Sequence, residues 1–205
     1  MDALGLFPLG LVLLPTEQVP LHIFEPRYRE LISECLEQET QFGLVYADDD
    51  GIREIGTRAA VVEVVERFDD GRLNIVVEGR DRFKLVELTD GRTFHTAAVE
   101  PVEDQDDPPD GLDAERALEL FRRLAELTGA QVEPPSPDAP ELSFALASRF
   151  ELSPDLKQEL LEATSERIRL KRLCELLGTA AETVERQREI AARAQTNGKV
   201  DPPGR

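Results

Sequence analysis

The first half of the chain consists of short apolar runs, rich in β-branched and aromatic residues, that break at Gly, Asp or Pro. Three of these breaks are Asp-Gly pairs, at residues 50–51, 70–71 and 90–91. An Asp-Gly pair accepts the positive φ angles of a tight turn, so the middle pair predicts a hairpin between residues 59–68 and 72–79. The alternating apolar residues of its second strand share one face: Leu73, Ile75 and Val77. The pattern predicts a β-rich unit over residues 4–103.

One helical segment interrupts these runs, and only helices are predicted in the second half. The first helix begins at Pro26, which fits a first helical turn because the N–H that proline lacks would have no partner there. Its apolar positions follow helical spacing: Tyr28, Leu31, Ile32, Cys35 and Leu36. Apolar spacing and capping residues predict later helices over residues 112–128, 141–150, 154–163, 165–178 and 179–196. Gly178 is the predicted end of one helix, and Thr179 with Glu182 forms the capping box of the next.

Composition changes abruptly between the two halves. Two prolines and no basic residue accompany a run of acids: Glu103, Asp104, Asp106, Asp107, Asp110 and Asp113. Charged segments usually stay extended in water, so we expect a solvated linker here. The predicted organisation is α+β, with a β-rich subdomain (residues 1–103), an acidic linker (104–113), a helical bundle (114–178) and a polar helix with a frayed tail (179–205).

Net charge limits the classes of partner. The 205 residues carry 42 Asp and Glu against 24 Lys and Arg, a net charge of −18, which repels phosphate backbones and anionic lipids. Nucleic acids and membranes are therefore not expected partners.

The apolar stretch over residues 4–15 contains prolines and glycines and is shorter than the roughly 20 residues of a membrane-spanning helix. Cys35 and Cys174 lie far apart and no cationic leader is present, so we expect a reduced, cytoplasmic protein.

The common catalytic and metal-binding motifs are missing from the sequence. No lysine precedes Ser or Thr, as a P-loop requires, and no glycine lies two residues from a serine, as a nucleophile elbow requires. The two histidines are too far apart for a helix-mounted zinc site, and the cysteines form no C-x-x-C pair. Residues 48–51 lack the ligand spacing of a calcium loop and are interpreted as a turn. We expect no enzyme activity, metal or cofactor.

Residues 7–29 read FPLGLVLLPTEQVPLHIFEPRYR. Further stretches follow at residues 42–43, 56–59, 70–72, 79–83, 142–147, 152–153, 157–162 and 169–177. Together they resemble the N-terminal, substrate-binding domain of the Lon protease family over about residues 4–178. The resemblance implies a PUA-like β pseudobarrel with one inserted helix, followed by a helical bundle. In full-length Lon this domain precedes ATPase and Ser-Lys peptidase modules and helps to capture unfolded or tagged proteins. Neither module is in this sequence, so we expect a free-standing, non-enzymatic member.

The resemblance carries over no catalytic residues, and the stretch from His22 to Tyr28 is interpreted mainly as a structural corner. Pro26 begins the helix, and Glu25 and Arg27 are expected to form charged hydrogen bonds that fix the turn from strand to helix. His22 lies between apolar neighbours, so we expect a packed, hydrogen-bonded side chain.

Apolar residues near this corner are the predicted peptide-binding surface, where a sheet edge supplies main-chain hydrogen bonds and pockets accept side chains. The candidates are Leu13, Pro15, Val19, Pro20 and Phe24, at least half of which are expected to lie in the buried core instead. The leading hypothesis is weak, reversible binding of exposed apolar segments in unfolded or client proteins. A separate full-length Lon and weak self-association through residues 180–196 are further partner hypotheses. RNA binding, known among PUA-like folds, is the alternative and requires a convergent set of arginines: Arg53, Arg58, Arg67, Arg72, Arg80, Arg82 and Arg92.

Overall fold

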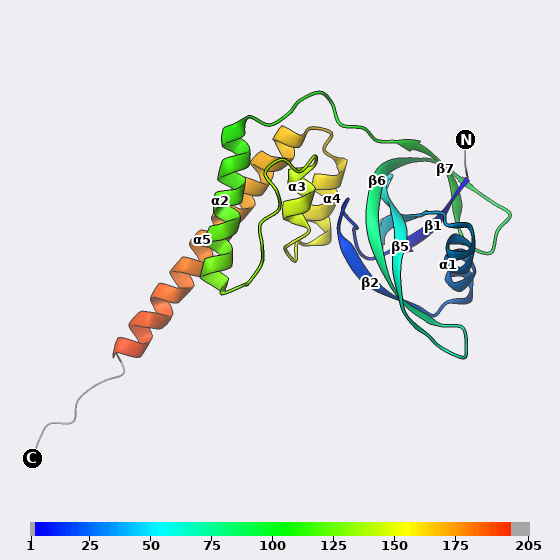
Figure 1. Cartoon of the computed structure of the whole chain (residues 1–205), viewed down its shortest axis with the longest axis horizontal. Coiled ribbons are helices and arrows are strands. Elements are labelled where there is room, and N and C mark those ends of the chain that lie inside the picture. The colour runs from blue at the N-terminus through cyan, green and yellow to red at the C-terminus, as the bar shows by residue number, and fades with distance from the viewer. Residues whose placement is uncertain (1–2, 198–205) are drawn as a thin grey trace, which may run out of the picture.

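The computed structural model of the chain describes residues 3–197 and contains a β-rich subdomain followed by a helical one (Figure 1). The strands are β1 (Ala3–Leu9), β2 (Gln18–Ile23), β3 (Phe42–Asp48), β4 (Gly51–Ile52), β5 (Ile55–Arg67), β6 (Leu73–Thr89) and β7 (Thr96–Pro101). The helices are α1 (Pro26–Gln38), α2 (Gly111–Thr128), α3 (Leu142–Ala147), α4 (Pro154–Glu162) and α5 (Glu166–Asn197). The predicted order of sheet, inserted helix and later helices is confirmed.

The sheet closes on itself. Strands pair in the order β1-β7-β6-β5-β3-β4, and β1 also pairs in parallel with β3, so β1, β7, β6, β5 and β3 form a ring. Strand β2 lies outside this ring, antiparallel to the first part of β6. The predicted hairpin joins β5 to β6, and its apolar face is buried at Leu73, Ile75 and Val77. Register shifts along β5 mark bulges, which increase the local twist and bending of this long ribbon.

Helix α1 packs its apolar side against the sheet, as predicted. Tyr28, Leu31, Ile32 and Cys35 are buried and join a core that includes Phe42. Because the opposite side of the helix is polar, α1 is an amphipathic cover for the β-rich subdomain.

The helical subdomain has its own core, in which Phe121 and Phe144 are 2% and 0% exposed. Its helix starts follow local chemistry: the Asp110 carboxylate accepts the Asp113 N–H at 2.8 Å, and Ser153 and Ser165 cap α4 and α5 as predicted.

The predicted end of a helix at Gly178 is wrong, because α5 continues from Glu166 to Asn197. Leu177 and Ala181, on either side of this glycine, both pack against α2 with Leu120 and Leu124. This tertiary packing keeps the helix continuous where local propensity favours a break. Figure 1 shows the far part of α5 extending beyond the other helices.

The loop between β1 and β2 joins the two subdomains. Val12 and Leu14 of this loop are buried in the helical core. The loop also crosses β6 at Gly79, whose N–H donates to the Glu17 carbonyl and whose carbonyl accepts the Thr16 N–H, both at 2.9 Å. A Cβ atom at Gly79 would lie 2.1 Å from the Leu14 carbonyl oxygen, so the crossing requires glycine.

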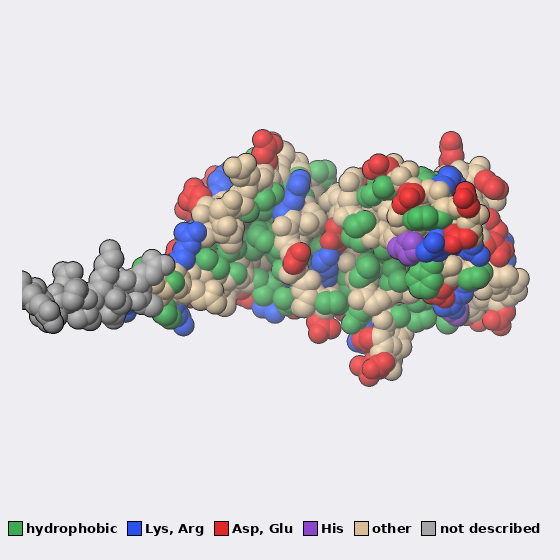
Figure 2. Space-filling view, turned by 90° about the horizontal axis from the view of Figure 1, so that it is seen from below, with side chains coloured by type: hydrophobic (Ala, Val, Ile, Leu, Met, Phe, Trp, Pro, Cys, Tyr) green, Lys and Arg blue, Asp and Glu red, His purple; other side chains and the backbone are tan. Residues whose placement is uncertain are grey.

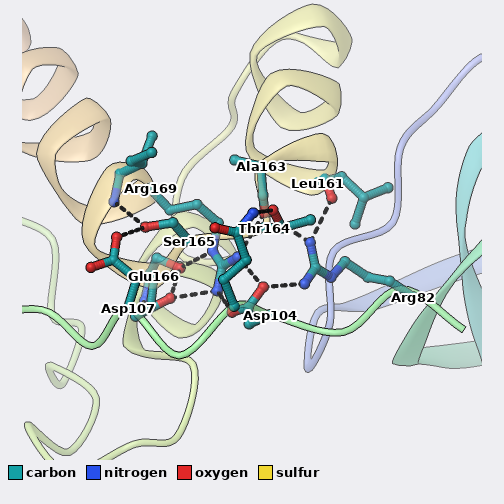
Figure 3. A network of polar contacts seen from close by, with 12 residues as sticks. Arg82, Asp104, Asp107, Leu161, Ala163, Thr164, Ser165, Glu166 and Arg169 are labelled. Atoms are coloured by element: carbon teal, nitrogen blue, oxygen red, sulfur yellow. Dashed lines mark hydrogen bonds and ion pairs between the residues drawn. The ribbon is translucent and has the colours of Figure 1, made fainter.

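The acidic linker is not simply solvated, contrary to the prediction, because Asp104 lies between two buried arginines (Figure 3). It pairs with Arg82 from β6 and with Arg169 from α5, at 2.8 Å from the Nη1 atom of Arg169. Arg82 also donates to the carbonyls of Leu161 and Ala163 at 2.9 Å. The linker therefore contributes the central charge of a network that connects both subdomains.

The rest of this network satisfies Arg169, whose side chain is 0% exposed. Its Nη2 donates to the Glu166 carboxylate at 2.7 Å, and its Nε donates to the Ser143 hydroxyl at 2.8 Å. Hydrogen bonding and opposite charges outweigh burial and raise the pKa of Arg169 above its usual value.

No helix among residues 3–197 is long and apolar enough to cross a membrane.

Candidate functional site

The turn from β2 into α1 is held by charge and ring contacts. Glu25 precedes the helix in an extended conformation, and Pro26 occupies the first turn. The Nε atom of Arg27 donates to the Glu25 carboxylate at 3.0 Å, a charged hydrogen bond of the kind expected of these two residues. The Arg27 guanidinium lies 4.5 Å from the centroid of the Tyr28 ring, which stacks on Phe7 at 4.0 Å. These contacts fix the direction in which the chain enters the helix.

An aromatic cluster lies beside this turn; we define it as the exposed His22 and Phe24 together with the half-buried Phe68. Phe24 is 60% exposed, and the His22 ring stacks beside it with 5.9 Å between centroids and 21° between planes. Phe68, at the end of the β5–β6 hairpin, meets His22 edge-on at 6.0 Å, and the Arg72 guanidinium lies 4.9 Å from the Phe68 ring. The cluster leaves apolar surface of Phe24 open to solvent.

His22 is hydrogen-bonded as predicted but exposed rather than packed. It lies opposite Asn74 on β6, with 2.6 Å between His22 Nδ1 and Asn74 Oδ1. The Asn74 Nδ2 atom donates to the Glu66 carboxylate at 3.1 Å. Because a carboxylate only accepts, the amide nitrogen faces Glu66 and its oxygen faces His22, so His22 Nδ1 carries the proton. This chain of bonds orients the imidazole beside Phe24.

Strand β2 has a free edge next to the aromatic cluster. It pairs with β6 from Gln18 opposite Glu78 to Ile23 opposite Leu73, and no other backbone group among residues 3–197 bonds to it. Pro20 suits such a strand, because a proline on an edge need not remove a ladder hydrogen bond. The side chains alternate: those of Gln18, Pro20 and His22 are exposed, whereas those of Val19, Leu21 and Ile23 pack on the core.

The structure separates the predicted peptide-binding residues into two groups. Leu13 is 1% exposed and Pro15 is buried, because both belong to the loop that crosses β6, so neither presents a surface to a ligand. Val19 is half-buried, whereas Pro20 and Phe24 are exposed. The candidate surface is therefore the edge of β2 with the aromatic cluster. Sequence reasoning missed Phe68, which the hairpin register brings beside His22.

A cleft of about 510 Å³ lies at the other end of β2, between the two subdomains. Its walls are the start of β2 with the preceding loop, and the end of α3: Thr16, Glu17, Gln18, Ala145, Ser148 and Arg149. Glu17 pairs with Lys157 and accepts the Leu14 N–H at 2.9 Å. Arg149 is exposed, and its guanidinium has no ion pair or hydrogen bond within the part of the chain that the structure describes.

The arginines required by the RNA-binding alternative do not form an unpaired basic face. Most of them pair with carboxylates: Arg53 with Asp48, Arg72 with Asp70, Arg80 with Glu78, Arg82 with Asp104 and Arg92 with Glu34. Figure 2 shows acidic and basic side chains interspersed over the β-rich subdomain. Across residues 3–197, no group of three or more His, Cys, Asp or Glu side chains is arranged to hold a metal ion. These arrangements favour neither RNA binding nor metal chemistry.

Two solved structures are similar to this chain. A Lon N-terminal domain protein from Xanthomonas campestris matches with a TM-score of 0.68 and 26% identity, covering 84% of this chain and 97% of that one. The N-terminal domain of a Mycobacterium avium complex Lon protease matches with a TM-score of 0.70, covering 86% and 98%. At 17% identity the second likeness shows the fold alone.

Sequence relatives agree with these structures. The Lon protease of Paraburkholderia phytofirmans is 28% identical over 93% of this chain and 25% of its own length. The Lon protease of Methylocella silvestris is 27% identical over 98% of this chain and 26% of its own length, so the chain spans about a quarter of these relatives. The family described as the ATP-dependent protease La (LON) substrate-binding domain matches residues 3–179, and the chain belongs to this family.

Proposed function

We propose that this chain binds exposed apolar segments of unfolded or client proteins, weakly and reversibly, through the aromatic cluster and the free edge of β2. The observation that carries the proposal is Phe24, a large apolar side chain that is 60% exposed beside two further rings. Folded proteins bury most of their large apolar side chains, whereas unfolded segments expose them. The chain's family is a substrate-binding one, which supports a binding role over a catalytic role.

The size of the surface accounts for weak binding. Complete burial of a phenylalanine side chain stabilises by about 1.5–3 kcal/mol. Part of Phe24 is already covered, so a contact there contributes about 1–2 kcal/mol, which by itself gives low affinity. Several copies acting on one unfolded client would raise the apparent affinity without any new contact.

Fluorescence anisotropy with a reduced, alkylated and labelled client tests the proposal. Phe24→Ser is expected to weaken binding about fivefold or more, because it removes about 1 kcal/mol or more of apolar contact. Ile168→Ser is the matched control, since Ile168 is also 60% exposed but lies on α5, away from β2. Absence of client binding at high micromolar protein, or equal loss in both variants, would contradict the proposal.

We also propose that the β-rich subdomain is a PUA-like pseudobarrel, which the ring of strand pairings supports. Self-association through α5 would use its far part, where Ile190 is 61% exposed, since Ala181 is already buried against α2. Sedimentation velocity of the chain alone, and of the chain mixed with a full-length Lon protease, tests self-association and the second partner.

A further inference from the structure

We infer that the site takes an extended client segment as an added β-strand along β2, and that it prefers a segment with an acidic group at one end and a large apolar side chain at the other. The acidic group would lie beside Arg149 and the apolar side chain beside Phe24. This inference rests on the proposed function and specifies which protein segments the site selects.

The backbone of β2 has unused hydrogen-bonding capacity. In an antiparallel pair, successive residues direct their N–H and C=O groups alternately toward the partner strand and away from it. Pro20 has no N–H to donate, so its backbone fits best facing the free edge, together with the N–H and C=O groups of Gln18 and His22. The backbone groups of Val19, Leu21 and Ile23 then face β6. An added strand would then pair with the N–H groups of Gln18 and His22 and with the carbonyl groups of Gln18, Pro20 and His22.

The two ends of this edge differ chemically. Strand β2 has six residues, so at about 3.3 Å per residue it spans roughly 20 Å and matches an extended segment of about the same length. The aromatic cluster lies at its Ile23 end, and the cleft with Arg149 lies at its Gln18 end. A segment that covers the whole edge therefore meets an apolar surface at one end and a cation at the other.

Charge complementarity selects the acidic group. The neighbouring cation, Lys157, is already paired with Glu17, whereas Arg149 has no carboxylate partner within the described residues. A carboxylate of the client would form a charge-assisted hydrogen bond with this guanidinium. The net charge of −18 attracts basic peptides at long range. A preference for segments with an acidic end would therefore be caused by Arg149 and not by the net charge of the chain.

Two labelled peptides of identical composition test the inference. Each has one Asp, one Phe and a spacer of alternating Thr and Val; in the first, Asp and Phe lie at opposite ends, and in the second they are adjacent. The first peptide is expected to bind at least fivefold more tightly by anisotropy. Arg149→Ala should abolish this difference and Arg149→Lys should retain most of it. N-methylation of alternate peptide bonds should remove binding, and bound peptide should slow amide exchange at Gln18 and His22.

The outcomes separate the inference from the proposed function. If an unfolded client binds and Phe24→Ser weakens it, but the two peptides bind equally, the inference is overturned and the proposed function stands. The same conclusion follows if Arg149→Ala, with unchanged circular dichroism, preserves the preference, or if N-methylated peptide binds normally. If neither client nor peptide binds, the proposed function itself fails.

Discussion

Replacing Asp104 with Asn removes the central charge between the two subdomains while keeping the shape of the side chain. Asp104 pairs with Arg82 and Arg169, whose side chains are 2% and 0% exposed. In the variant, Arg82 would retain its hydrogen bonds to backbone carbonyls, and Arg169 would retain a backbone carbonyl and the Glu166 carboxylate. The variant therefore measures how strongly the linker holds the subdomains together.

The expected loss of stability in Asp104→Asn follows from the burial of the two arginines. Removing one partner of a fully buried ion pair costs about 3–5 kcal/mol, because the other charge is left uncompensated. The Asp104 side chain is 26% exposed and Arg169 retains Glu166, so we expect a smaller loss of about 2–3 kcal/mol. For a chain of this size, that corresponds to a decrease in Tm of about 5–10 °C.

The pH dependence of this effect has a defined sign. Burial alone would raise the pKa of Asp104, but hydrogen bonds and charges from Arg169 and Arg82 outweigh it and hold the pKa below its usual value. The stabilisation is therefore fully present above the unfolded pKa of about 3.9 and is lost as pH falls through the lower folded pKa. The difference between wild type and Asp104→Asn should be constant from neutral pH to about pH 5 and should shrink below about pH 4.

Urea denaturation followed by circular dichroism measures these differences. Asp106→Asn is the matched control, because Asp106 is exposed in the same acidic segment and its side chain has no ion pair or hydrogen bond within residues 3–197. The control is expected to change stability by less than about 0.5 kcal/mol. Equal unfolding midpoints for the two variants would refute the stabilising role of the network.

Three further substitutions are measured by the same denaturation. Gly178→Ala should stabilise by about 1 kcal/mol, because Gly178 lies inside α5 with open space around it, and a loss instead would mean that the helix ends there. Gly79→Ala should destabilise by about 2–3 kcal/mol through the clash with Leu14, and an unchanged midpoint would contradict the close crossing. Burial raises the pKa of Glu141 although the charges of Arg169 and Arg82 lower it. Glu141→Gln should therefore stabilise the folded protein at pH 7, and this gain should fade as pH falls through the raised folded pKa of Glu141. Equal stability of the variant and wild type at pH 7 would contradict this expectation.

Features encoded by neighbouring residues were predictable. The Asp70-Gly71 turn, the start of α1 at Pro26 and the serine caps of α4 and α5 depend on backbone preferences and on hydrogen bonds that span a few residues. The ion pair of Glu25 with Arg27 is local in the same way.

Residues whose role depends on a distant segment were misjudged or missed. Gly178 is typical of a helix end by its local propensity, but packing against α2 keeps α5 continuous through this residue. For Leu13 and Pro15 the sequence left open a place on the peptide-binding surface or in the core, and the crossing of their loop over β6 buries them. Phe68 and Arg149 carried no sequence signal, because each joins the candidate site from an element far along the chain.

The sequence by itself determined the family, the order of strands and helices and the chemistry of the corner between β2 and α1, since periodicity, caps and turns act over short separations. Only the tertiary structure decided which apolar side chains remain exposed and which charges are paired. Asp104 shows the reason: its pairing with two buried arginines exists only after segments from both subdomains come together, and no local sequence pattern predicts it.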